Sequence, residues 1–167
     1  MKRLRTWVLI AVAATALPVV YVYSGVFDVA ADAPHSALVY AAMEVVRDRS
    51  IAVRIRDIQV PALDDPHLIA EGAEHYAAMC AECHLAPGVD KTDLREGLYP
   101  TPPNLTKHIA ANATEMFWVV KHGIRNTAMP AWGTLLSDED IWQVVTLVRK
   151  FDSLPDSATL ELKGHHH

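Results

Sequence analysis

The stretch Cys80-Ala81-Glu82-Cys83-His84 decides what this chain can fold around. It holds the two cysteines of the sequence, spaced C-x-x-C and followed at once by a histidine. A disulfide between cysteines this close would close almost no loop, so it would stabilise the fold little and would leave His84 unexplained. A thioredoxin-like redox pair is expected within a βαβ unit, and a structural zinc site needs four ligands, whereas this region has a helical pattern and the chain has no further cysteine.

The same five residues fit the attachment signature of a c-type haem. One turn of chain lets two thiols reach the two vinyl groups on one edge of the porphyrin, while the next residue places an imidazole beneath the iron. We therefore expect one covalent haem c, attached through Cys80 and Cys83, with His84 as an axial ligand of its iron.

The second axial ligand has to come from elsewhere, and Met129 is the leading candidate. It lies in a predicted loop downstream of a helix, where Pro130 fixes the backbone beside the sulfur. A lone methionine is more often core filler, but its place in a loop favours ligation. His108 and His122 are rival ligands, and ligation by two histidines would lower the redox potential relative to a histidine and a methionine.

The N-terminus carries Lys2, Arg3 and Arg5 ahead of an uncharged, mostly apolar run from Thr6 to Phe27. About 20 such residues cross a bilayer as a helix. A cleaved secretory signal is the alternative, but this run exceeds the roughly 7 to 15 apolar residues of a signal core. Because basic residues stay in the cytoplasm, we expect a single-pass helix in the bacterial cytoplasmic (inner) membrane and a C-terminal domain in the periplasm.

A second helical pattern runs from Ser36 to about Arg56. Four of its apolar residues fall near one stripe, namely Val39, Met43, Val46 and Val53. The simpler interpretation is an amphipathic helix that packs on its own domain through that stripe. A juxtamembrane helix that docks on a partner or on lipid headgroups, drawn by its arginines, is the alternative.

Three further helices follow, and no strand pattern appears, so the exported domain is predicted to be all-α. The first begins with Asp65 as N-cap and Pro66 at its first position, and it runs into the cysteines. The second begins near Thr114 and ends at Gly123, and the last begins at Ser137. The residues expected to face the core are Leu68, Ile69, Gly72, Ala73, Tyr76 and Met79 in the first, and Ile141, Val144, Val145, Val148 and Phe151 in the last.

Residues 68–154 resemble the monohaem, His/Met-ligated cytochrome c domain. The matching positions are Gly72 and Tyr76 before the C-x-x-C-H motif, Pro87-Gly88 after it, residues 121–130 as the loop of the distal ligand, and Trp142 in the terminal helix. The resemblance implies that the first and last helices of the domain cross, with Gly72 permitting a close approach near Trp142. It also implies that the Pro102-Pro103 loop and the region of Trp132 line the haem crevice.

Four segments are expected along the chain. Residues 1–27 are the transmembrane anchor, residues 28–64 are a linker with the juxtamembrane amphipathic helix, and residues 65–155 are the cytochrome c domain. Residues 156–167 are a tail whose closing histidines are typical of a purification tag, so they are left out of any argument about metal ligands. The net charge is −5 and the sequence has no basic stripe, so we do not expect the protein to bind nucleic acid.

If His84 and Met129 both bind iron, no coordination position is open for a substrate. The expected function is therefore one-electron transfer by a protein that is not itself an enzyme, as a carrier or as the cytochrome subunit of a respiratory or oxidoreductase complex. Its expected partners are redox proteins or a membrane oxidoreductase complex, and the lipid bilayer. Arg125, Lys121 and Tyr99 are candidates to bond the haem propionates.

Two other classes of function stay open at this point. In a small haem peroxidase, Met129 would be absent from the iron, and His122 or His108 would assist as an acid or base. In a haem-based sensor or assembly module, residues 36–56 would be the interaction surface.

Overall fold

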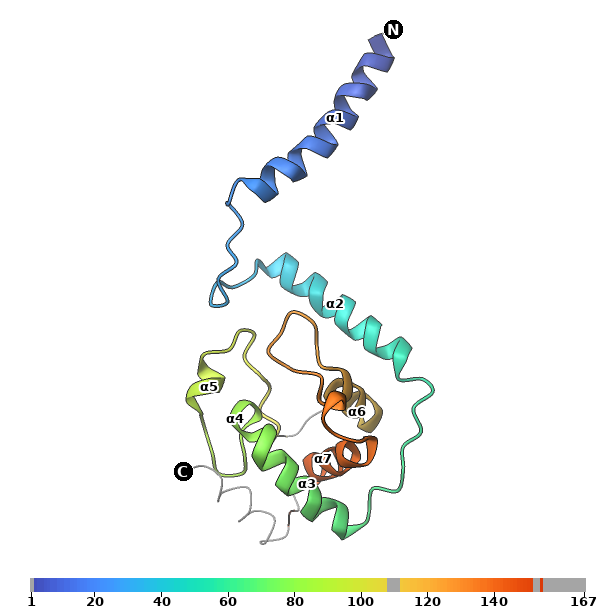
Figure 1. Cartoon of the computed structure of the whole chain (residues 1–167), viewed down its shortest axis with the longest axis vertical. Helices are drawn as coiled ribbons and strands as arrows, with labels where there is room; N and C mark the ends of the chain where they lie inside the picture. The colour runs from blue at the N-terminus through green and yellow to red at the C-terminus, as the bar shows by residue number, and fades with distance from the viewer. Residues whose placement is uncertain (1, 108–111, 152–153, 155–167) are drawn as a thin grey trace. The chain divides into compact units, whose positions relative to one another are not determined.

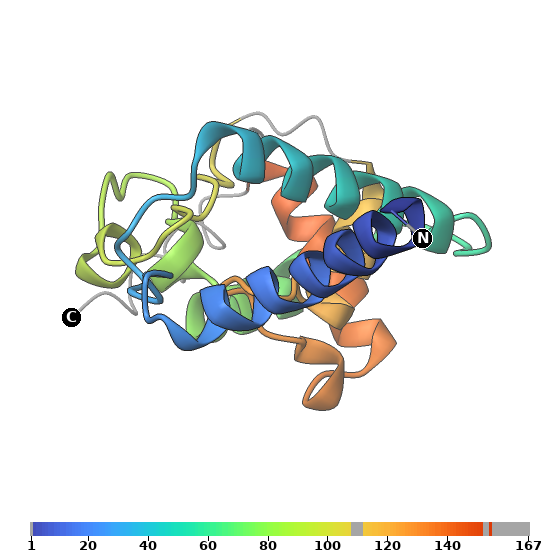
Figure 2. The same cartoon turned by 90° about the horizontal axis from the view of Figure 1, so that it is seen from above.

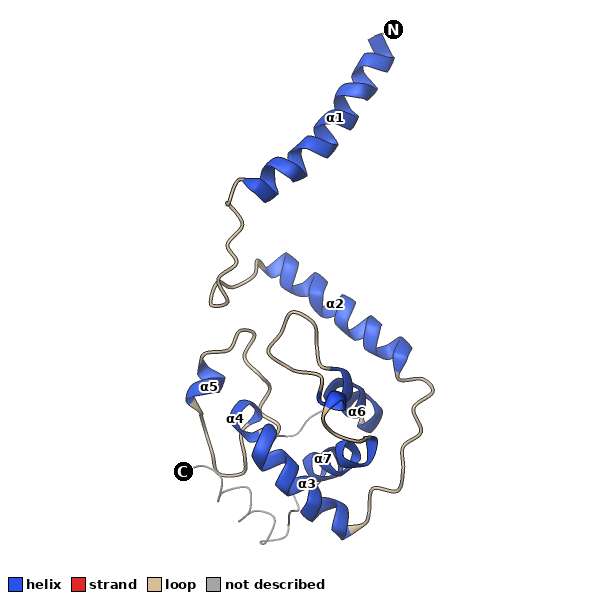
Figure 3. Ribbon diagram, viewed as in Figure 1, coloured by secondary structure: helices blue, strands red, loops and turns tan. Residues whose placement is uncertain are grey.

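The computed structural model describes residues 2–107, 112–151 and 154. All regular elements among these residues are helical, which confirms the all-α prediction (Figures 1 and 3). Contacts divide the chain into two compact units, Met1–Pro34 and His35–His167. The helices are α1 (Lys2–Tyr23), α2 (Ala37–Arg54), α3 (Pro66–Met79), α4 (Ala81–His84), α5 (Asp93–Glu96), α6 (Ala113–His122) and α7 (Asp138–Arg149), with a 3-10 turn, η1 (Trp132–Thr134).

The first unit consists of α1 and the segment that follows it. The helix has 22 residues, a mean hydropathy of 1.9 over its most apolar window, and none of its described side chains is buried. At about 1.5 Å per residue it is long enough to cross the hydrocarbon core of a bilayer. Pro18 lies within it, which membrane helices tolerate. By length and composition, α1 is a candidate for a single-pass membrane anchor.

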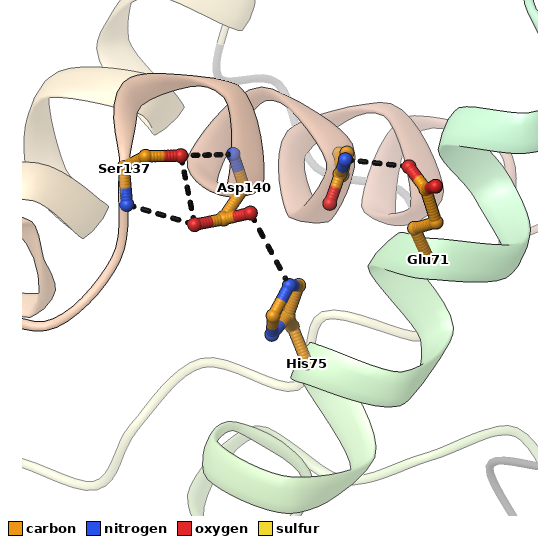
Figure 4. Close-up of polar contacts among 5 residues, drawn as sticks. Glu71, His75, Ser137 and Asp140 are labelled. Atoms are coloured by element: carbon orange, nitrogen blue, oxygen red, sulfur yellow. Dashed lines mark hydrogen bonds and ion pairs between the residues drawn. The ribbon is translucent and has the colours of Figure 1, made fainter.

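Two helices of the second unit begin at the caps that the sequence predicts. The Asp65 side chain accepts a hydrogen bond from the His67 backbone N–H at 2.9 Å, and Pro66 fills the first position of α3. Ser137 and Asp140 form a reciprocal capping box at the start of α7 (Figure 4). Each cap satisfies backbone donors that the first helical turn leaves without a partner.

The start of α6 differs from the prediction. Asn112, and not Thr114, is the N-cap, and its side-chain oxygen accepts a hydrogen bond from the Glu115 backbone N–H at 2.8 Å. Asparagine caps helices at least as well as threonine. The Thr114 hydroxyl donates to Asn112 at 2.6 Å, so the threonine supports the cap without forming it.

The domain is organised around the crossing of α3 and α7. A Cβ atom at position 72 would lie 2.6 Å from the backbone carbonyl carbon of Gln143, so only glycine permits this approach. Beside the crossing, the Gln143 side-chain amide donates to Glu71 at 2.6 Å and His75 pairs with Asp140 at 3.5 Å (Figure 4). The close approach expected from Gly72 is confirmed.

Helix α7 is the centre of the core, because all of its residues from Ile141 to Val148 are buried. Tyr76 and Leu147 are fully buried in the cluster that joins α7 to α3. On the other side of α7, the Trp142 ring stacks on Phe117 of α6 with ring centroids 4.3 Å apart. Four of the five residues predicted for its apolar stripe are buried in α7, and the fifth, Phe151, lies two residues beyond the end of the helix and is half-buried.

Helix α2 packs on α6 (Figure 2). It does not do so through the stripe that the sequence predicts. Its buried residue is Ile51, and Tyr40 and Ile55 on the same face are half-buried. The four residues of the predicted stripe are 37% to 68% exposed, namely Val39, Met43, Val46 and Val53. That part of the prediction is wrong, because α2 has apolar residues on both faces and the pattern does not say which face meets α6.

The crossing predicts that Gly72→Ala is destabilising. The added methyl group would push α3 away from the Gln143 backbone, and overpacking of this kind costs about 1 to 3 kcal/mol. Gly97→Ala is the matched control, because a Cβ there would make ordinary contacts at 3.6 Å. Denaturant unfolding of the two variants measures the difference. Equal stability of the two would contradict the close crossing.

Candidate functional site

The C-x-x-C-H residues lie on one turn of helix. Cys80 is the C-cap of α3 and the N-cap of α4, and its carbonyl accepts hydrogen bonds from the backbone N–H groups of Cys83 at 3.1 Å and His84 at 2.9 Å. This turn holds two sulfur atoms and an imidazole in a fixed relation to one another. The cysteines are half-buried and form no disulfide.

Both thiols are held in the neutral form. Burial, with a smaller contribution from the nearby Cys83, raises the pKa of Cys80 to about 12. Burial also raises the pKa of Cys83, and the charge of Glu82 adds to this effect. A catalytic redox cysteine needs a lowered pKa. The raised pKa values of both thiols therefore disfavour the thioredoxin-like alternative.

The His84 ring is oriented by the backbone of the proline-dense loop, residues 99–103. Its Nδ1 lies 2.9 Å from the Pro103 carbonyl oxygen. A carbonyl can only accept, so Nδ1 carries the proton and Nε2 presents its lone pair. Burial lowers the pKa of His84, the Arg95 charge lowers it further, and the bond to Pro103 opposes both. The imidazole is thus in the neutral form that binds a metal.

The backbone on the far side of His84 is held just as firmly. Leu85 adopts a positive φ of 66°, a conformation that costs a non-glycine residue of order 1 to 3 kcal/mol. The buried Tyr76 hydroxyl donates to the Leu85 carbonyl at 2.6 Å, and the Leu105 backbone N–H donates to the His84 carbonyl at 3.1 Å. The Leu85 side chain is also buried. These contacts keep the chain in the turn that aims His84.

Arg95 of α5 places a positive charge at the site. This residue is not among those predicted from the sequence. One of its guanidinium nitrogens, Nη2, donates to the Pro102 carbonyl at 3.0 Å. Its Nε is buried and has no hydrogen-bond partner among the described residues. A buried donor of a cation near His84 calls for an anionic group, and the propionates of a haem are such groups. The residues present therefore fit a haem, and no motif in the sequence marks Arg95.

The three propionate candidates named from the sequence fit less well. Lys121 pairs with Asp138 at 2.6 Å, and Arg125 is exposed. The Tyr99 hydroxyl accepts a hydrogen bond from the His35 backbone N–H at 3.3 Å, and its ring packs edge-on against the imidazole of that residue. Each of these side chains has a surface position or a partner of its own.

The backbone of Met129 is held against the end of α6. The Ile124 backbone N–H donates to the Met129 carbonyl at 3.2 Å, and the Met129 N–H donates to the Thr127 hydroxyl at 3.1 Å. Gly123, with a φ of +64°, lies so close that a Cβ there would be 2.6 Å from the Met129 carbonyl oxygen. Met129 is half-buried and Pro130 is exposed. Ligation of iron by Met129 stays a prediction.

The rival ligands receive no support from the described geometry. His122 is the exposed last residue of α6, and its ring lies against Trp118 with centroids 4.9 Å apart. His108 lies outside the described residues. Over residues 2–107, 112–151 and 154, no three His, Cys, Asp or Glu side chains come together as a metal site. A structural zinc centre in that part of the chain is therefore not supported.

Comparison with known proteins places the site within a family. Residues 67–148 match the family model described as cytochrome C oxidase, cbb3-type, subunit III. The match begins in α3 and ends in α7, so it includes the C-x-x-C-H turn and the Met129 loop and leaves out α1 and α2. No curated protein matches the chain significantly. The resemblance seen in the sequence is confirmed for this domain.

The turn after His84 predicts that Tyr76→Phe lowers stability. The variant removes the donor to the buried Leu85 carbonyl, and an unpaired buried acceptor costs about 1 to 3 kcal/mol. Tyr40→Phe on α2 is the matched control and is expected to change the free energy of unfolding by less than about 0.5 kcal/mol. Denaturant unfolding followed by circular dichroism measures both. A Tyr76→Phe protein as stable as the control would show that this bond does not hold the turn.

Proposed function

The chain carries a cytochrome c domain of the cbb3-type subunit III family, with covalent haem c, and we propose that it uses this domain to transfer single electrons. The haem supplies the one-electron iron couple when bound. The observation that carries the proposal is the hydrogen bond between His84 Nδ1 and Pro103, because it leaves Nε2 free to bind iron.

We assign the two axial positions to His84 and Met129, and thioether attachment to Cys80 and Cys83. Pro130 limits the backbone freedom beside Met129, and the hydrogen bonds to Ile124 and Thr127 support the same loop. Two protein ligands leave no open coordination position for a substrate. A methionine also raises the potential relative to a second histidine. Both consequences suit an electron carrier or a cytochrome subunit, not a peroxidase.

Arg95 is assigned to a haem propionate. Its unpaired Nε and its bond to the Pro102 carbonyl would hold a carboxylate close to the His84 side of the site. A fixed positive charge there favours the reduced, less positive iron, so Arg95 would raise the potential.

The side of the membrane on which the cytochrome c domain would lie is inferred from the basic residues at the start of α1. Lys2, Arg3 and Arg5 flank the N-terminal end of α1, and basic residues are retained in the cytoplasm. The cytochrome c domain would then lie on the periplasmic side of the bacterial inner membrane. Its electron donor and acceptor would be proteins of a respiratory or oxidoreductase complex, consistent with the oxidase subunit family that the domain matches.

Replacing Met129 tests the ligand assignment. Met129→Ala should open the sixth position, give a high-spin or differently ligated haem, allow carbon monoxide to bind the ferrous protein and lower the potential. Met43→Ala on the exposed surface of α2 is the control and should change none of these properties. Absorption spectra and redox titration report the outcome. An unchanged spectrum and potential in Met129→Ala would refute the assignment.

Replacing Arg95 tests the propionate assignment. Arg95→Gln removes a partly buried positive charge that would stabilise the reduced haem by about 1 to 2 kcal/mol. The variant should therefore have a redox potential about 40 to 90 mV lower. Arg125→Gln, at an exposed arginine, should shift it less, because water screens the charge. Redox titration of the two holoproteins decides the point. Equal shifts, or no shift in Arg95→Gln, would remove Arg95 from the site.

Protease accessibility tests the orientation. In right-side-out membrane vesicles, added protease should release the haem-bearing domain, because the domain would face the outside. In inverted vesicles it should be protected. Haem-stained gels follow the fragment, and release from inverted vesicles alone would place the domain in the cytoplasm.

A further inference from the structure

Helix α2 presents an apolar stripe that the described part of the second unit leaves uncovered. Its larger members and their exposed fractions are Leu38 (81%), Val45 (60%), Val46 (68%) and Val53 (56%). Their spacing of seven, one and seven residues puts them on one side of the helix, with the exposed Ala42 and Arg49 between them. Ile51, which packs on the domain, lies on the opposite side. This side of α2, the apolar stripe, consists of Leu38, Ala42, Val45, Val46, Arg49 and Val53.

The charges of α2 are divided between the two sides. Arg47 pairs with Asp48 at 2.8 Å and with Glu44 at 3.8 Å, along the flank that turns toward the domain. Arg49 has no ion pair among residues 2–107, 112–151 and 154, and it is exposed within the apolar stripe. The two acidic residues of α2 therefore lie away from the stripe, and the one charge on it is positive.

This combination favours a lipid surface over a protein partner. A protein interface would bury Arg49 among apolar side chains and would have to supply it with a paired anion. At a bilayer surface the apolar residues enter the boundary between headgroups and acyl chains, while an arginine extends its guanidinium to the phosphates. Anionic headgroups also attract a cation that has no acidic neighbour on its face.

The covalent connection to α1 keeps α2 near a bilayer. Residues 24–36, thirteen in number, separate the two helices. A fully extended chain of that length spans at most about 45 Å. Three apolar side chains in the connection are highly exposed, namely Val26, Phe27 and Val29. The helix is thus held at a high effective concentration near the membrane that α1 crosses.

We propose that α2 lies on the surface of the anionic phospholipid bilayer in which α1 is embedded, with its apolar stripe at the boundary between headgroups and acyl chains and Arg49 bound to lipid phosphates. The helix then orients the cytochrome c domain relative to the membrane, because α2 packs on α6. This inference depends on α1 as an anchor and does not depend on the ligands of the iron.

The test uses the full-length holoprotein in vesicles of phosphatidylcholine and phosphatidylglycerol. Haem attachment through Cys80 and Cys83 leaves an introduced cysteine as the only free thiol, so a nitroxide can be placed at Val45→Cys, on the stripe. Asp48→Cys, three residues later on the flank, is the matched control. Oxygen concentrates in the bilayer and a hydrophilic nickel complex stays in water, and collision of each with the label reports its depth. The haem spectrum of each variant confirms that the domain has folded.

The proposal predicts that the label at 45 collides more with oxygen and that the label at 48 collides more with the nickel complex. Equal access of the nickel complex to both positions would overturn it. Broadening of the spectrum at 45 that vanishes on dilution with unlabelled protein would overturn it too, in favour of a second copy on the stripe.

The contribution of the Arg49 charge is tested separately, in the Val45→Cys protein. Adding Arg49→Gln should lower the ratio of docked to undocked helix about fivefold, which corresponds to about 1 kcal/mol for one arginine at an anionic surface. Vesicles of phosphatidylcholine alone should lower the ratio in the same direction. No change in either case would remove anionic lipid as the ligand of Arg49.

Discussion

The hydrogen bond between His84 Nδ1 and the Pro103 carbonyl is the constraint on which the site depends. It determines which imidazole nitrogen keeps a lone pair, and it ties the C-x-x-C-H turn to the proline-dense loop. The same loop offers the Pro102 carbonyl to Arg95, so one backbone segment orients both the His84 imidazole and the Arg95 guanidinium. A short loop without regular structure can do this because its prolines restrict the backbone.

The rest of the domain holds the proline-dense loop and the C-x-x-C-H turn in a fixed position relative to each other. The approach of α3 to α7 at Gly72 sets the position of the helix that carries the cysteines. From α3 the Tyr76 hydroxyl then reaches past the motif to the Leu85 carbonyl. The crossing of α3 and α7 thus affects the orientation of the His84 imidazole through the buried hydrogen bond from Tyr76 to Leu85. Helix packing therefore influences the conformation of the turn and, through it, the orientation of the imidazole.

Local features could be predicted from the sequence, and features set by distant contacts could not. The C-x-x-C-H turn, the Asp65 cap and the stripe of α7 each follow from neighbours a few residues away. The inward face of α2 depends on α6, and its own pattern allows either face. Arg95 becomes notable only because folding buries its Nε beside the Pro102 carbonyl, and no spacing of residues signals that. Ligation by Met129 stays a prediction, and the hydrogen bonds of its backbone to Ile124 and Thr127 are what support it.

The coordination of iron by Met129 opposite His84 is the central claim, and one spectrum tests it most directly. The sequence has five methionines, so their methyl groups can be labelled with carbon-13 and resolved by NMR in the reduced holoprotein. A methyl held over the porphyrin is displaced far upfield by the ring current. The account predicts one such resonance, belonging to Met129, with the other methionines in the ordinary range. A spectrum in which every methionine methyl lies in the ordinary range would contradict it.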